Sequence, residues 1–454
     1  MKESLLSKEG FFFVCFLFGQ VEPREINISL KQVIRVKLII GVASQGMMVE
    51  KTKSYDVLVI GAGPSGSQVA CKLAGMGYAV GVIEKKENLG GVVCCTGLVS
   101  HECVEKYSIP ENVIYRWANS ASLYSPSGKP IHVQRDEPQV AVLNRTSFNQ
   151  NWAEKALQAG AEYIFGYNAE DIERDKGKVS LEISRRGESL TLQSRAVVIA
   201  TGFGTQLLDK FGLGGAGDFA MGAQAEVETQ DMEEVAVFFG SKIAPEFFAW
   251  IAPTSPGKAL VGLLSRKNAA FYLKKILAAL VQDNKIISAD VKLSYGGITL
   301  KPLPHTYSDN LLVVGTAAGQ VKPLTGGGIY FGLICADIAA NTLNRALEAD
   351  KLSADDLAGY QRAWRRKLAR ELTTGYWARK AYEMLNDHQV DRVFGLLEST
   401  GIVEEMCQAR ELSFDWHADV IARLMGQKLF ERALNTIERP FNRKEKPGMA
   451  IKNN

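Results

Sequence analysis

The sequence has no excess of charge of either sign and no recognisable pattern of cysteines. Its 53 Lys and Arg residues nearly balance 50 Asp and Glu residues, giving a net charge of +3, which predicts no nucleic-acid partner. The 7 cysteines are an odd number, spread from Cys15 to Cys407, and several lie in apolar runs. They therefore predict neither a disulfide framework nor a metal site, and they favour a reducing compartment. We expect a cytoplasmic protein.

A long hydrophobic run is also absent. The most apolar stretch, Phe11–Phe18, is too short to span a bilayer. It makes a poor signal peptide, because glutamates offset the flanking lysines and no small-residue cleavage site follows closely. Met47 and Met48 lie just before the first strand pattern. We therefore expect residues 1–50 to be an extension that is either disordered or not part of the native protein.

The chain does contain a dinucleotide fingerprint in its required context. Tyr55–Ile60 is an apolar run of strand length that leads into Gly61-Ala62-Gly63-Pro64-Ser65-Gly66. A helical pattern follows, and then a second strand that ends on Glu84. The glycines allow a tight turn, close approach of the backbone to a pyrophosphate and close helix–strand packing, while the helix start favours phosphate. Because Glu84 can accept hydrogen bonds from a ribose diol, the sequence predicts a βαβ unit that binds a dinucleotide.

Two further segments suggest contacts with a ligand. In Cys94-Cys95-Thr96-Gly97, either cysteine can be a proton donor beside a redox cofactor or a small buried residue, and the spacing alone favours the second. Arg145 opens a helical pattern, for which Thr146 or Ser147 is the expected cap. A cation at a helix start opposes the dipole, which favours an anionic partner for Arg145.

Two later glycine clusters differ in their context. Gly212–Gly217 has the fingerprint letters, but no strand precedes it and no helix follows, so we expect a loop. Asn310–Gly315 is a buried strand pattern, and Gly326-Gly327-Gly328-Ile329 begins a helix that runs to about Ala349. Glycines at a helix start admit a planar ligand, and the dipole there favours the anionic edge of a reduced flavin.

Strand patterns between these segments predict a second sheet. They cover Ala223–Phe239, Ala249–Pro253 and Ala259–Leu264, with a helix over Ala269–Val281. Phe248 and Trp250 can either floor an apolar pocket or form the core of this sheet. Residues 354–434 then read as amphipathic helices. Their basic stretch from Arg362 to Arg370, with Trp377 and Arg379 beyond, can lie on an anionic membrane or be a solvated face.

Taken together, these residues resemble the geranylgeranyl reductase family. The shared features are the fingerprint with Glu84, Cys94-x-x-Gly97-Leu98, Arg145, the Gly315–Ile329 segment and the run Phe248-Ala249-Trp250-Ile251-Ala252-Pro253. The resemblance covers about residues 54–435. It implies an FAD enzyme of the p-hydroxybenzoate hydroxylase fold that reduces the alkenes of an isoprenoid lipid. The electron donor stays open, since NAD(P)H, ferredoxin and a quinone-linked donor all fit, and peripheral membrane association and a redox-donor protein are further expectations.

The implied architecture is α/β (α+β). An FAD-binding Rossmann-like domain, 51–345, would comprise segments of about 54–120, 145–205 and 300–345. An inserted β-sheet substrate domain would comprise about 121–144 and 206–299. A C-terminal helical region, 346–437, and a tail, 438–454, would follow.

The resemblance also implies roles for single residues. Ser65 and Glu84 would hold the pyrophosphate and the adenosine ribose, Arg145 the ribityl or phosphate groups, and Ala169 the adenine. The full cofactor set would be Gly61, Gly63, Ser65, Gly66, Glu84, Cys94, Cys95, Gly97, Arg145, Ala169, Thr316, Gly328 and Ile329. Phe248 and Trp250 would line the substrate pocket, and no metal is implied. Cys94, with Cys95 second, would protonate one alkene carbon while reduced FAD supplies hydride to the other.

Three departures from the family pattern leave alternatives open. Thr316 stands where the family has Asp, and Phe248 and Ala252 replace a Tyr and a Phe of the aromatic motif. Thr201-Gly202 stands where related hydroxylases have Asp-Gly, which weakens that function. The alternatives are a flavin-dependent monooxygenase or halogenase of the same fold, and a non-catalytic flavoprotein that binds a lipid.

Overall fold

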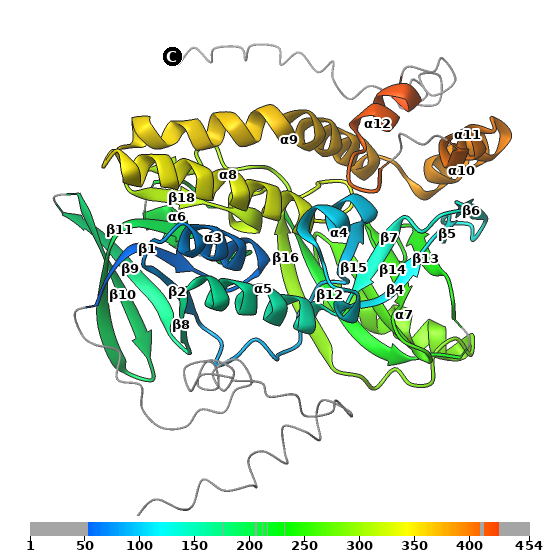
Figure 1. Cartoon of the computed structure of the whole chain (residues 1–454). Helices are drawn as coiled ribbons and strands as arrows, with labels where there is room; N and C mark the ends of the chain where they lie inside the picture. The colour runs from blue at the N-terminus through cyan, green and yellow to red at the C-terminus, as the bar shows by residue number, and fades with distance from the viewer. Residues whose placement is uncertain are drawn as a thin grey trace, which may run out of the picture. The chain divides into compact units, whose positions relative to one another are not determined.

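The computed structural model describes residues 53–175, 177–204, 207–210, 212–215, 217–230, 232–408 and 413–425. The chain divides into two units, Met1–Gly46 and Met47–Asn454, and all described residues belong to the second (Figure 1). The expected extension, 1–50, and the expected tail, 438–454, lie outside the described residues.

The fingerprint strand β1 (Ser54–Ile60) lies inside a sheet whose core strands are parallel. It pairs with β2 (Val80–Glu84) on one side and with β11 (Glu188–Ile199) on the other. β8 (Glu162–Phe165) and β18 (Leu311–Val313) extend the parallel order, and the short β17 (Tyr307–Ser308) pairs antiparallel with β18. Most residues of β1, β2, β18 and the parallel half of β11 are buried, as expected for strands covered on both faces, whereas β8 at the end of the order is only partly buried.

Different layers cover the two faces of this sheet. One face packs against α3 (Pro64–Gly75), α5 (Arg145–Ala159) and α8 (Ile329–Glu348). The other packs against α6 (Leu207–Lys210) and the hairpin of β9 (Asn168–Asp175) and β10 (Lys178–Arg185).

β11 extends beyond the parallel core of the sheet. It begins at Glu188, and its first half pairs antiparallel with β10.

A second sheet is ordered β16-β12-β15-β14-β13-β5-β6. All its pairs are antiparallel except β13 with β5. Its strands are β5 (Ser120–Tyr124), β6 (Pro130–Gln134), β12 (Phe219–Glu228), β13 (Val235–Phe239), β14 (Phe248–Pro253), β15 (Lys258–Ser265) and β16 (Leu293–Thr299). α7 (Ala269–Gln282) packs Leu273, Leu277 and Leu280 against one face. The stretch Ala223–Phe239, predicted as one strand, is divided between β12 and β13.

A small sheet connects the two larger ones along the chain. It is ordered β3 (Leu98–Ser100), β7 (Val140–Leu143) and β4 (Ile114–Ala118), with α4 (His101–Tyr107) and the 3-10 turn η1 (Glu111–Val113) between strands. The next helix, α5, is capped by Asn144, whose side chain accepts a hydrogen bond from the Ser147 N–H. The prediction of Thr146 or Ser147 as cap was therefore wrong by a few residues.

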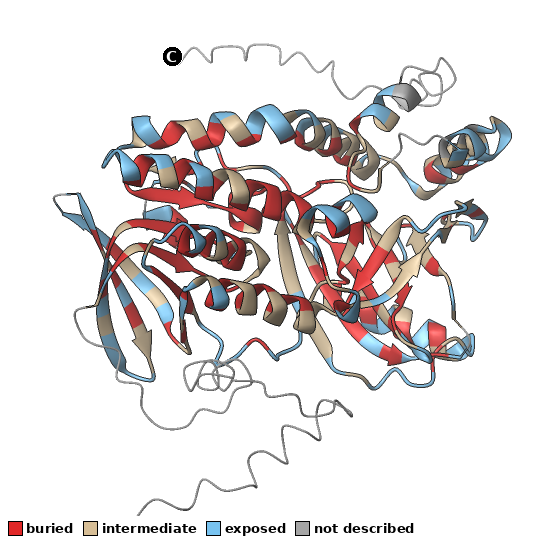
Figure 2. Cartoon of the chain, viewed as in Figure 1, coloured by how far each residue is buried: buried red, intermediate tan, exposed pale blue. Residues whose placement is uncertain are grey.

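Helices complete the described chain. The 3-10 turn η2 (Gly315–Ala318) precedes α8, and α9 (Ala354–Glu383) packs beside α8 through Tyr360, Trp364 and Leu368. Figure 2 shows buried residues on the inner faces of both helices and exposed residues outside. α10 (Asp387–Ser399), α11 (Ile402–Gln408) and α12 (Ala418–Met425) follow. Within the described ranges, no helix has the length and apolar character needed to cross a bilayer.

Candidate functional site

The fingerprint turn lies where β1, β2 and β11 end. Gly61 has φ +106°, and a Cβ on it would lie 2.5 Å from the Ala200 carbonyl oxygen at the end of β11. A Cβ on Gly66 would overlap the Gly61 carbonyl oxygen. The turn therefore admits no side chain at either position, and it brings the start of α3 to the carboxyl edge of the sheet, where ligands of such sheets bind.

Glu84 is fixed at the same edge by backbone donors. Its Oε2 accepts a hydrogen bond from the Ala62 N–H at 2.9 Å, and its Oε1 accepts one from the Lys86 N–H at 3.0 Å. The carboxylate is half-buried, and each oxygen retains a lone pair for a ribose hydroxyl. Ala169, in β9, lies two residues beyond Tyr167, whose N–H donates to the Glu84 carbonyl oxygen at 3.2 Å.

The starts of α3, α7 (after Asn268) and α8 lack both a side-chain cap and an acidic first-turn residue, and those of α3 and α8 lie together at the fingerprint turn. α3 begins after Gly63 and α8 begins at Ile329 after Gly328. By contrast, α4, α5, α9 and α10 are capped by Ser100, Asn144, Ser353 and Asn386. The first-turn N–H groups of α3 and α8 can therefore donate hydrogen bonds to a phosphate or to the anionic edge of a ring.

The Ser65 side chain joins these two starts. A Cβ on Gly315 would lie 2.7 Å from the Ser65 Oγ, and one on Gly332 would overlap it. Ser65 therefore packs where α3, η2 and α8 meet, and its backbone N–H is the group it can present to a pyrophosphate.

Arg145 carries donors that the protein does not satisfy. Its Nε and Nη1 are buried and have no hydrogen-bond partner, while the guanidinium lies 5.1 Å from the Phe148 ring centre. Gly97, with φ +78°, gives it room, because a Cβ there would lie 2.7 Å from the Arg145 Cδ. Unpaired buried donors are destabilising unless a ligand supplies acceptors. Ribityl hydroxyls or phosphates would supply them, so the site fits an FAD molecule.

The segment that contains Cys94 crosses from this edge to the second sheet. A Cβ on Gly296 in β16 would lie 3.5 Å from the Cys94 Sγ. Burial raises the pKa of the Cys94 thiol to about 11, although a hydrogen bond with Ser294 acts in the opposite direction. Thr96 donates from Oγ1 to the Gln224 Oε1 at 2.8 Å. Cys95 is half-buried, and its N–H donates to the Val93 carbonyl oxygen at 2.9 Å.

Phe248 and Trp250 lie on the face of the second sheet that Cys94 contacts. Trp250 pairs with Gly262, Gly262 with Gln224, and Gln224 with Ser294, so these four residues form one row on one face. Three strand spacings of roughly 4.8 Å separate Trp250 from Ser294. A Cβ on Gly262 would lie 2.5 Å from the Trp250 ring, and the Trp250 Nε1 is buried without a partner. The Phe248 and Trp250 ring centres are 5.9 Å apart.

The segment 322–328, which we call the cofactor loop, approaches the same face. A Cβ on Gly326 would lie 2.9 Å from the Leu264 Cδ1 in β15, and Leu264 is two residues from Gly262. Thr316 lies beside the loop's end, since a Cβ on Gly328 would be 3.6 Å from the Thr316 Oγ1. The buried Lys322 fixes the loop's start through an ion pair with Asp415 at 2.6 Å. The structure therefore brings the cofactor loop, Cys94 and Trp250 to one face.

Sequence reasoning missed several residues of this site. They are Gln224, Ser294, Lys322, Arg379 and Asp415. A lone amide in an apolar strand marks Gln224. The others have partners that depend on long-range packing, so no local signal identifies them.

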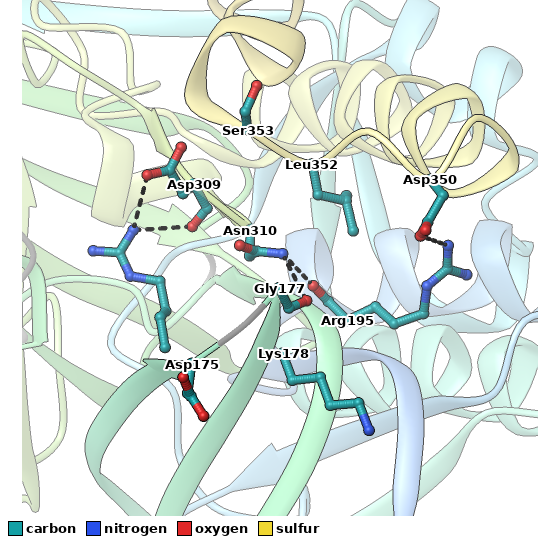
Figure 3. Close-up of a pocket in the computed structure, with 10 residues that line it drawn as sticks. Asp175, Gly177, Lys178, Arg195, Asp309, Asn310, Asp350, Leu352 and Ser353 are labelled. Carbon is teal, nitrogen blue, oxygen red and sulfur yellow. Dashed lines mark hydrogen bonds and ion pairs between the residues drawn. The ribbon is translucent and has the colours of Figure 1, made fainter.

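An open depression of about 670 Å³ lies elsewhere (Figure 3). Its arginines are paired, Arg195 with Asp350 at 2.8 Å and Arg174 with the Asp309 carbonyl oxygen at 3.1 Å. It lies toward the amino ends of the parallel strands, and no predicted site residue lines it. We assign it no function. Across the described residues, no group of three or more His, Cys, Asp or Glu side chains could hold a metal ion.

Comparisons with known proteins point to a family of oxidoreductases. Residues 55–283 match the family model described as pyridine nucleotide-disulphide oxidoreductase. A digeranylgeranylglycerophospholipid reductase of Methanocaldococcus jannaschii is 32% identical over 357 residues, which cover 76% of this chain and 90% of that protein.

Solved structures are similar over most of the chain. A geranylgeranyl bacteriochlorophyll reductase-like protein of Thermoplasma acidophilum has a TM-score of 0.74 and 25% identity, covering 85% of this chain and 99% of that one. A flavin-dependent brominase has a TM-score of 0.61 at 16% identity, covering 85% of this chain and 98% of that one, a likeness of fold alone.

Proposed function

Since this chain belongs to the geranylgeranyl reductase family of FAD-dependent oxidoreductases, we propose that it reduces carbon–carbon double bonds of an isoprenoid lipid of the geranylgeranyl type. The observation that carries the proposal is the shared face of the second sheet. On that face the Cys94 thiol, the Phe248–Trp250 pair and the cofactor loop converge. The name of the archaeal relative supports the same class of substrate.

The residues of the site would hold a proton and exclude water. FAD, when bound and reduced, supplies the hydride for one alkene carbon. Cys94 would give the proton to the other carbon, since burial keeps its thiol protonated at neutral pH. A thiol with so high a pKa is a weak acid, so its effect depends on close contact with the alkene. Phe248 and Trp250 would form the apolar wall that keeps the lipid chain in place.

We also propose that the enzyme works at a membrane surface. The outer face of α9 exposes Arg362, Arg366 and Arg370 along successive turns, and then Trp377, which is 65% exposed. Basic side chains followed by an aromatic one suit an anionic lipid interface. Arg379, expected on this surface, is instead buried, because it faces the inner side of the helix. NAD(P)H or ferredoxin remains the proposed electron donor.

Anaerobic turnover tests the function directly. Protein reduced with dithionite and mixed with a polyprenyl lipid should raise the lipid mass in steps of two hydrogens while the flavin is reoxidised. A monooxygenase or halogenase would leave the lipid unchanged without oxygen. A non-catalytic flavoprotein would keep its flavin reduced with every polyprenyl lipid tried, and that result would refute the proposal.

A further inference from the structure

Arg379 is a buried cation held by backbone carbonyl groups. Its side chain lies in α9 and is only 2% exposed. Nε donates to the Pro323 carbonyl oxygen at 3.4 Å, Nη1 to the Glu246 carbonyl oxygen at 3.1 Å, and Nη2 to the Leu324 carbonyl oxygen. All three acceptors are backbone groups from other parts of the chain. The guanidinium therefore joins α9 to two segments that are far from it in the sequence, 323–324 and Glu246.

Aromatic rings enclose the same guanidinium. Its carbon lies 4.4 Å from the ring centre of Phe247, 5.3 Å from that of Tyr382 and 5.8 Å from that of Phe248. Tyr382 also donates from its hydroxyl to the Phe247 carbonyl oxygen at 3.0 Å. Burial lowers the pKa of Arg379 to about 10, so the side chain stays charged at neutral pH. The cation–π contacts and carbonyl bonds together offset part of the desolvation of the charge.

The two segments that Arg379 bonds belong to the two halves of the candidate site. Pro323 and Leu324 are in the cofactor loop, and Glu246 directly precedes Phe247 and Phe248 at the start of β14. One helical turn before Arg379, Gly375 lets α9 approach the same loop, since a Cβ on it would lie 3.3 Å from the Pro323 Cδ. α9 therefore contacts the cofactor loop through Gly375 and Arg379, and the aromatic segment through Arg379 and Tyr382.

We propose that Arg379 is a positioning residue that fixes the cofactor loop relative to the aromatic wall of the lipid pocket. The inference rests on the proposed function, because the distance it sets is that between the flavin and the alkene. Arginine suits this role because its planar fork presents five N–H donors in several directions at once. Lysine carries the charge but presents its donors from one atom, so it cannot reach all three carbonyls.

Two variants perturb the loop by different routes. Arg379→Lys keeps the charge and removes the fork. Gly375→Ala keeps Arg379 and pushes Pro323 by a few tenths of an ångström. Lys380→Met is the matched control, since Lys380 is the next residue and binds Asp218 and Glu383 at 3.0 Å in a partly exposed ion network. All three are prepared as FAD-loaded holoenzyme.

The readouts are the visible absorption spectrum of the bound flavin, its dissociation constant and single-turnover reduction of a polyprenyl lipid. Arg379→Lys and Gly375→Ala should both shift the flavin spectrum and slow the rate per bound flavin by at least tenfold. The KM for the lipid, measured in steady-state assays, should change less than this rate. Lys380→Met should leave the spectrum and the rate unchanged.

A purely structural role predicts a different result. Arg379→Lys would then lower the melting temperature but keep the spectrum and the rate per bound flavin of the parent, and that result would overturn the proposal. A parental spectrum in Gly375→Ala together with a parental rate would do the same. If the parent holoenzyme reduces no lipid at all, the proposed function fails by itself, whereas the spectral shifts still decide whether Arg379 positions the loop.

Discussion

The Glu84 carboxylate is already oriented by the protein, because the Ala62 and Lys86 N–H groups hold one oxygen each. A ribose diol would meet a fixed acceptor, and little side-chain entropy would be lost on binding. Arg145 offers the opposite case, with fixed donors that lack acceptors. At the scale of single residues, the site is complementary to a ligand that has both hydroxyl donors and anionic oxygens.

Removing the Glu84 carboxylate should loosen FAD without blocking chemistry. Each charge-assisted hydrogen bond is worth about 1.5–3 kcal/mol, so Glu84→Ala should raise the FAD dissociation constant roughly 10-fold or more. Titration of the flavin fluorescence measures this dissociation constant. Glu87→Ala is the control, because Glu87 follows in the same turn but binds Arg185 and Arg186 at the surface. Equal affinity in both variants would contradict a ribose role for Glu84.

The Cys94 thiol should set both the size and the pH dependence of the rate. Cys94→Ser should slow single-turnover lipid reduction by about 10²–10⁴-fold, a typical contribution of general acid catalysis, and Cys95→Ser should be milder. Because the acid form is the active one and burial raises its pKa to about 11, the parent rate should stay level from neutral pH to about pH 10 and fall above it. A fall centred near the ordinary thiol pKa of 9 would contradict this, as would equal rates in both serine variants.

At the scale of elements, β14 and β15 fit together through the pairing of Trp250 with Gly262. Gly262 has no side chain, and the indole ring of Trp250 occupies the space that a side chain there would fill. The same face has a second glycine, Gly222, whose added Cβ would be tight only against the flexible end of Leu264 at 3.3 Å, with the Gly296 and Leu263 carbonyl oxygens at an ordinary 3.7 Å. A side chain at Gly262 would therefore displace the Trp250 ring, whereas one at Gly222 would displace only the end of Leu264.

Gly262→Ala should move the indole ring and damage the lipid pocket. Overpacking of this kind is worth about 1–3 kcal/mol, so KM for the lipid should rise roughly 10-fold while the FAD dissociation constant stays the same. Gly222→Ala, on the same face, should change KM much less, because a leucine methyl group can rotate away. Steady-state kinetics with flavin titration distinguishes the two. A matching loss of FAD in Gly262→Ala would place Trp250 at the cofactor and not at the lipid.

Local patterns explain which elements could be predicted. The fingerprint, Glu84 and the glycine start of α8 follow from residues close in sequence, and the structure has them where expected. The row from Trp250 to Ser294 depends on the register of four strands, which no local pattern specifies. Arg379 was predicted on the exposed face of α9 for a similar reason. The sequence of a basic helix does not show which of its arginines face the core until the packing of the helix is known.

At the scale of the whole molecule, the outer face of α9, with its exposed arginines and Trp377, should make the protein bind anionic membranes. Sedimentation with vesicles should show binding to anionic but not to neutral lipid, and the binding should weaken at high salt because the Debye length falls from about 10 Å at 0.1 M to about 3 Å at 1 M. Arg362→Glu with Arg366→Glu should abolish it, and Trp377→Ala should weaken it at every salt concentration. Lys274→Glu with Lys292→Glu is the control for net charge, because both lysines are exposed outside α9 and the double change alters the net charge by the same amount. Salt-independent binding, or equal loss in the control, would refute the assignment of this face.

The ion pair between Lys322 and Asp415 also sets an order of events during synthesis. The fingerprint turn leaves the ribosome first, but the cofactor loop has no partner for Lys322 until Asp415 has been made. At about 5–20 residues per second, the interval between synthesis of the fingerprint turn and synthesis of Asp415 is on the order of tens of seconds. We therefore expect the βαβ unit to be able to form before Asp415 has been made, and the start of the cofactor loop to be fixed only afterwards.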